Sequence, residues 1–83
     1  MPAIDPCKQA KEALEKAKHH LKRCATELDE EQHKLAQLRA AQPPDPKAIA
    51  AQEEEVDDAK KRLRKAQERV REEQERVDEI CSP

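Results

Sequence analysis

The three cysteines, together with His20, are the residues of this chain whose types and spacing could support chemistry. Cys7 and Cys81 stand near the two ends of the sequence, and Cys24 stands four residues after His20. If the two ends meet, a Cys7–Cys81 disulfide closes a loop of about 75 residues and destabilises the unfolded chain by about 4–5 kcal/mol. We therefore predict this disulfide. It implies an oxidising compartment, extracytoplasmic or secreted for a natural protein, or a deliberate staple in a designed one.

His20 and Cys24 lie one helical turn apart and offer two ligands of the kinds that zinc binds. Two ligands do not complete a site, so a metal-linked assembly would need a second pair from another chain. The same two residues are the candidates for a cysteine nucleophile and its base, but nothing nearby would form an oxyanion hole. We interpret Cys24 as a small core residue, with an intermolecular disulfide as an alternative. We expect no catalytic residue, metal site, cofactor or enzymatic activity.

The composition argues against a conventional compact domain. Charged residues make up 43% of the 83 residues and hydrophobic ones 35%, and Phe, Tyr, Trp and Gly do not occur. Small compact domains normally bury aromatic rings, and this chain has none. The two states that fit its composition are an extended helical assembly and a disordered chain. The 17 basic and 19 acidic residues nearly cancel, which argues against disorder and against a general attraction to nucleic acid or lipid. The longest apolar run covers only residues 48–51, so we expect no membrane insertion.

Two helix starts are marked by the same pair of residues. Asp5-Pro6 and Asp45-Pro46 each place a capping carboxylate before a proline at the first helical position, where the missing N–H of proline costs nothing. The segment 42–46 contains three prolines, and a helix cannot continue through it. The sequence therefore predicts helices over about residues 6–41 and 46–80, joined by a turn at 42–46, as one domain spanning 1–83.

A heptad repeat runs through both predicted helices without interruption. In the first helix the a and d positions are Cys7, Ala10, Leu14, Ala17, Leu21, Cys24, Leu28, Glu31, Leu35 and Leu38. In the second helix they are Ile49, Gln52, Val56, Ala59, Leu63, Ala66, Val70, Glu73, Val77 and Ile80. Most flanking positions are charged, which is typical of the narrow seam of a coiled coil. We expect Glu31 and Glu73 to reach toward solvent or to meet a partner.

The turn sets the register between the two seams. A tight turn near residues 43–44 pairs residues whose numbers sum to about 87, which places each a position opposite a d position. This register brings Glu27 opposite Arg62 and Lys34 opposite Glu55 across one flank. The predicted layers include Cys7/Ile80, Ala10/Val77, Leu14/Glu73, Leu28/Ala59, Glu31/Val56 and Leu35/Gln52.

Nearly every layer combines one larger apolar residue with a small or polar one, so the two backbones can approach closely. The pattern resembles the alanine-rich antiparallel coils called Alacoils, an architectural resemblance that implies no function. The sequence thus predicts an all-α fold, an antiparallel two-helix coiled-coil hairpin. Because two helices alone bury little surface, a homodimer that forms a four-helix bundle is a further prediction.

The charges are grouped along the rod. We define a turn-side acidic belt as Glu27, Asp29, Glu30, Glu31, Glu53, Glu54, Glu55, Asp57 and Asp58. The adjacent basic belt is Lys16, Lys18, Lys22, Arg23, Lys60, Lys61, Arg62, Arg64 and Lys65. An acidic group toward the open end is Glu72, Glu73, Glu75, Asp78 and Glu79. Such a pattern is either an ordinary solvated helix surface or a surface that steers a helical partner.

The function that these features favour is a structural or protein-interaction module, whose partner is a second copy or another helical protein. A designed or idealised helical scaffold is an alternative, as is the metal-linked assembly through His20 and Cys24. Nucleic-acid binding through the basic belt is a weaker alternative, because Asp58 and Glu68 flank the basic run and no aromatic residue is present to stack on bases. A small-molecule substrate is not expected.

Overall fold

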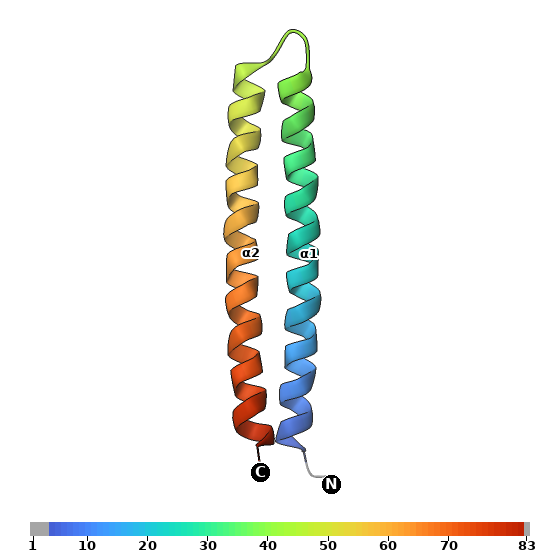
Figure 1. The fold of residues 1–83 in the computed structure, drawn as a ribbon, viewed down its shortest axis with the longest axis vertical. Helices are drawn as coiled ribbons and strands as arrows, with labels where there is room; N and C mark the ends of the chain where they lie inside the picture. The colour runs from blue at the N-terminus through green and yellow to red at the C-terminus, as the bar shows by residue number, and fades with distance from the viewer. Residues whose placement is uncertain (1–3, 83) are drawn as a thin grey trace.

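The computed structural model describes residues 4–82 and contains, over that range, two long helices joined by a short turn (Figure 1). Helix α1 spans Pro6–Ala40 and helix α2 spans Pro46–Cys81. The helices lie side by side and run in opposite directions, so the two ends of the chain meet at one end of the rod. The rod measures 65 × 21 × 15 Å. The predicted all-α helical hairpin is confirmed.

Both helix starts have the predicted caps. The Asp5 carboxylate accepts a hydrogen bond from the backbone N–H of Cys7 at 3.0 Å. The Asp45 carboxylate accepts two, from the N–H groups of Lys47 at 3.1 Å and Ala48 at 3.2 Å. These side chains satisfy N–H groups that have no carbonyl partner in the first turn of a helix. Two residues therefore suffice to define where each helix begins.

The helix ends differ from the prediction by one residue each. Helix α1 stops at Ala40, because Ala41 has extended backbone angles, φ −67° and ψ 145°. Helix α2 continues to Cys81, one residue beyond the expected end, where a disulfide holds its last turn. The Gln42–Pro43 peptide bond in the turn is cis. Residues 1–3 and 83 of the predicted domain lie outside the described residues.

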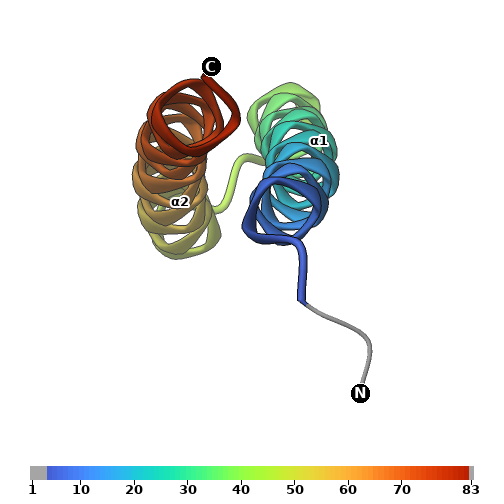
Figure 2. The same cartoon turned by 90° about the horizontal axis from the view of Figure 1, so that it is seen from below.

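The seam between the helices follows the predicted heptad positions. Among residues 4–82, every buried residue occupies an a or d position: Ala10, Leu14, Ala17, Cys24, Leu35, Val56, Ala59, Ala66, Glu73 and Val77. Seen end-on in Figure 2, the two helices form one layer, so each keeps its outer face in solvent. Within the described range, neither helix has an apolar segment long enough to cross a membrane.

The predicted register is met at the cluster of Ala10, Leu14 and Val77 and at the Glu27–Arg62 ion pair, but not in the last layer at the open end. Ala10 and Leu14 of α1 pack with Val77 of α2, as the expected layers require. In the last layer Ile80 was predicted to face Cys7, but it is 42% exposed, and Cys81 occupies the seam instead. This prediction was wrong because a disulfide requires the two Cα atoms to approach within about 4.4–6.8 Å, so Cys81 must face α1 and its neighbour turns aside.

Candidate functional site

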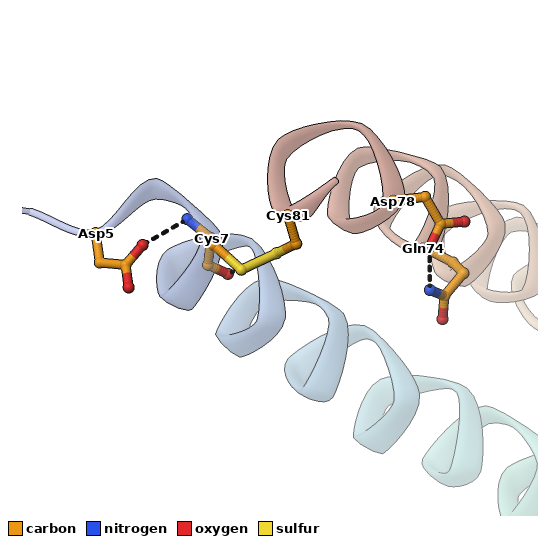
Figure 3. The surroundings of a disulfide bond; sticks show 5 residues. All are labelled: Asp5, Cys7, Gln74, Asp78 and Cys81. Carbon is orange, nitrogen blue, oxygen red and sulfur yellow. Dashed lines mark hydrogen bonds between the residues drawn. A yellow bond between two sulfur atoms is a disulfide. The ribbon is translucent and has the colours of Figure 1, made fainter. Parts of the chain in front are cut away.

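The open end of the hairpin is closed by a disulfide between Cys7 and Cys81 (Figure 3). The bond joins the first turn of α1 to the last residue of α2, with the two Cα atoms 5.0 Å apart. Its Cys7 side is also fixed by the Asp5 cap, and on α2 the Gln74 amide donates to Asp78 at 3.1 Å. The structure therefore contains the predicted disulfide. The hairpin is joined covalently at both ends, by the turn and by this bond.

Cys24 is a free cysteine in the middle of the seam, and it is only 2% exposed. Its Sγ lies 3.6 Å from Nε2 of His20, which is itself exposed on the flank of α1. No third His, Cys, Asp or Glu within residues 4–82 joins the two to form a group that could hold a metal ion. The interpretation of Cys24 as a small core residue is confirmed. A zinc site through His20 and Cys24 would need ligands from another chain.

Glu31 and Gln52 form the polar centre of the turn-side half of the seam. The Gln52 Nε2 donates to Oε2 of Glu31 at 2.6 Å and to the Glu31 backbone carbonyl at 2.9 Å. The hydrogen bond from Gln52, aided by the nearby Lys34 and Arg62 charges, holds the pKa of Glu31 below its ordinary value despite partial burial. Glu31 is therefore held by a contact across the seam of its own chain, and its contact with a partner protein stays a prediction.

Glu73 is buried in the open-end half of the seam and is only 5% exposed. Its Oε1 contacts Arg69 Nε at 3.0 Å along the same helix, while its Oε2 has no hydrogen-bond partner. The expected reach toward solvent does not occur, since Glu73 stays buried at its d position in the seam. A carboxylate oxygen left without a partner in this position destabilises the fold.

One of the two predicted ion pairs across the flank is present. Arg62 Nε lies 3.8 Å from Glu27 Oε2, and both side chains are about half exposed. Lys34 instead pairs with Glu31 at 3.3 Å on its own helix, and no Lys34–Glu55 ion pair occurs in the part of the chain that the structure describes. Lys34 pairs with Glu31 because the two residues lie one helical turn apart and the Glu31 carboxylate is already held in place by Gln52.

The remaining members of the acidic and basic belts are exposed along both helices. The two belts adjoin at a shallow groove on α1, which is lined by residues of both belts. Its lining side chains are His19, Lys22, Arg23, Thr26, Glu27 and Glu30. A groove lined by one helix can contact a partner surface but does not enclose a small ligand.

Sequence reasoning identified the disulfide, the caps and the Glu27–Arg62 pair, but it missed the Gln52–Glu31 contact and the burial of Glu73. The signal for the contact was present, since Gln52 and Glu31 are polar residues in adjacent predicted layers. The chain matches no protein-family model, and no curated protein or solved structure was found to be similar to it.

Proposed function

We propose that this hairpin is a non-enzymatic structural module that binds a protein partner through its charged outer surface. The observation that carries the proposal is the grouping of exposed acidic and basic side chains into adjacent belts on a rod 65 Å long. Complementary charge across an interface orients a partner and speeds encounter. A rod with one narrow seam has most of its surface available for such contact.

The disulfide supports this role because it makes the surface rigid. Two isolated helices with a thin apolar seam are marginally stable, and the bond between Cys7 and Cys81 prevents their free ends from separating. A fixed axial alignment of α1 and α2 keeps the belts in register. The same bond is consistent with an oxidising environment, and we propose an extracytoplasmic or secreted location.

The hairpin is also proposed to pack as an antiparallel coiled coil, which would give the outer surface a regular twist. The alternation of larger and smaller residues along the buried seam supports this packing, as in the cluster of Ala10, Leu14 and Val77.

Affinity capture tests the interaction role. The oxidised hairpin, carrying Cys24→Ala to prevent mixed disulfides, is immobilised and exposed to extract of the producing cells at low salt. We expect a protein to be retained in stoichiometric amount and released as ionic strength rises. The matched control is the same chain with Cys7→Ala and Cys81→Ala, which has the same charges on a less rigid scaffold. Retention of no protein beyond that on an empty matrix would reject the proposal.

A further inference from the structure

The polar contacts that join the two helices lie between the turn and the middle of the rod. We call residues 25–40 of α1 and 46–62 of α2 the turn-side half, and residues 7–24 and 63–81 the open-end half. In the turn-side half, Gln52 donates two hydrogen bonds to Glu31, and Arg62 pairs with Glu27 at 3.8 Å. In the open-end half, within the described residues, no side-chain hydrogen bond or ion pair connects α1 with α2 apart from the two bonded cysteines. That half is therefore held by its seam and by the disulfide.

The seam of the open-end half is poor in large buried side chains. Its buried residues are Ala10, Leu14, Ala17, Cys24, Ala66, Glu73 and Val77. The larger side chains of Leu21, Leu63 and Val70 are only partly buried. Small residues remove little apolar surface from water, and the Glu73 oxygen without a hydrogen-bond partner opposes its own burial. The apolar seam alone thus holds this half weakly.

The two ends of the hairpin are tethered by different chemical bonds. At the turn, peptide bonds keep the adjacent ends of α1 and α2 together. At the open end, the bond between Cys7 and Cys81 joins residues that are 74 positions apart. The entropic cost of keeping two residues together grows with the length of chain between them, so helices joined only at the turn separate first at the other end. Both cysteines are partly exposed, which gives a reductant access to the bond.

We propose that the Cys7–Cys81 disulfide is a redox latch for the open-end half of the rod. A dithiol reductant transfers two electrons and two protons to the bond. The S–S bond breaks, thiols form on both cysteines, and the dithiol becomes a disulfide. The open-end half then separates up to the Glu27–Arg62 ion pair, while the hydrogen bonds from Gln52 to Glu31 keep the turn-side half together. Reoxidation closes the rod again.

Opening the latch changes which groups the chain exposes. The apolar side chains of Leu14 and Val77 and the thiol of Cys24, all buried in the oxidised rod, become accessible. The basic-belt residues on the two helices of this half also lose their fixed relative positions. The latch is a property of the chain alone, so it goes beyond the proposed interaction role and is tested without a partner.

A pair of matched thiol probes tests the latch. Ala17→Cys lies in the open-end half and Ala59→Cys in the turn-side half, and both alanines are buried in the seam. Each probe is made in the Cys24→Ala background, so that it is the free thiol of the oxidised chain. A latch-free counterpart of each also carries Cys7→Ser and Cys81→Ser. The rate of alkylation by iodoacetamide is measured for all four chains, relative to the rate of the same chain in urea.

We expect both probes to react slowly while the disulfide is intact. In the latch-free chains, the rate at Ala17→Cys should rise at least tenfold more than the rate at Ala59→Cys. Because a new sulfur can disturb a tightly packed seam, amide hydrogen exchange of the Cys24→Ala chain provides a second measurement. Dithiothreitol should accelerate exchange at least tenfold more in the open-end half than in the turn-side half, and reoxidation should restore the original rates.

The weakness of the open-end seam has its own test. Glu73→Leu removes the carboxylate that lacks a partner, so it should reduce the acceleration by dithiothreitol in that half at least threefold. Glu72→Leu is the matched control at an exposed position and should not reduce it. Equal acceleration in both halves would show that the hairpin unfolds as one unit. No acceleration in either half would show that the seam holds without the bond. Either result would overturn the latch, as would an unchanged response in Glu73→Leu.

Discussion

Gln52 of α2 donates from its side-chain amide to both the carboxylate of Glu31, at 2.6 Å, and the backbone carbonyl of the same residue, at 2.9 Å. The two residues lie 21 positions apart in sequence and belong to different helices. Because the amide contacts a backbone atom as well as a side chain, it fixes the axial position of α2 against α1. This polar contact complements the apolar seam, which by itself tolerates sliding.

Removal of the Gln52 amide should raise the pKa of Glu31 toward its ordinary value of 4.5. The hydrogen bond from Gln52 is the largest cause of the lowered pKa, so Gln52→Ala leaves the carboxylate with only its ionic neighbours. Carboxyl carbon titration by NMR measures the change. Gln37→Ala is the matched control, because Gln37 is exposed and contacts His33 rather than Glu31. An unchanged pKa in Gln52→Ala would contradict the assignment.

The lowered pKa of Glu31 predicts a loss of stability in acid. A carboxyl group whose pKa is lower in the folded than in the unfolded state contributes stability that is present above the unfolded pKa. That contribution disappears as pH falls from the ordinary value of 4.5 through the lowered folded-state pKa. Urea denaturation between about pH 7 and about pH 3 should show the natural chain and Glu31→Gln converging in acid. If the difference in free energy of unfolding between the two chains stayed constant across that pH range, the predicted contribution of Glu31 would be wrong.

Replacement of the buried Glu73 by leucine should stabilise the hairpin by about 1–3 kcal/mol, the cost of a buried polar atom without a partner. The ion pair that is lost is small in effect, because the Arg69 side chain is 66% exposed. Thermal and urea denaturation measure the change. Glu72→Leu, at an exposed neighbouring position, should alter the free energy of unfolding by less than about 0.5 kcal/mol. Destabilisation by Glu73→Leu would show that the carboxylate is required by the fold.

Removal of the disulfide should destabilise the chain by about 4–5 kcal/mol in the chain-entropy model. The estimate follows from the 74 positions that separate Cys7 from Cys81. The variant with both cysteines replaced by alanine is compared with Cys24→Ala, which removes a thiol but no cross-link. A difference below about 1 kcal/mol would mean that the unfolded chain already keeps its ends together.

The thiol of Cys24 should react with a disulfide reagent at least tenfold more slowly in the folded chain than in urea. The residue is 2% exposed, so reaction requires the helices to separate locally. An exposed cysteine two positions away, introduced as Thr26→Cys in the Cys24→Ala background, provides the reference rate on the same helix. Equal rates at the two positions would show that the seam opens freely at its centre.

The sequence alone determined where the helices begin, where the chain turns and which residues form the seam. The reason is that these signals are local: Asp5-Pro6 and Asp45-Pro46 act within one helical turn, and the prolines at 43 and 44 cannot be helical donors. The heptad extends this local order over both helices, because apolar residues on one side of each helix can be buried only against each other. The disulfide followed from the same arrangement, which brings Cys7 and Cys81 together.

Only the tertiary structure decided which of several nearby partners each polar side chain contacts. Lys34 pairs with Glu31 on its own helix rather than with the predicted Glu55, and Gln52 contacts Glu31 across the seam. At the open end the disulfide turns Cys81 inward and Ile80 outward, although their positions differ by one residue. Which contacts form depends on the axial offset between the two packed helices and on the distance between their axes. A heptad pattern does not determine these two quantities precisely enough to decide between neighbouring hydrogen-bond partners.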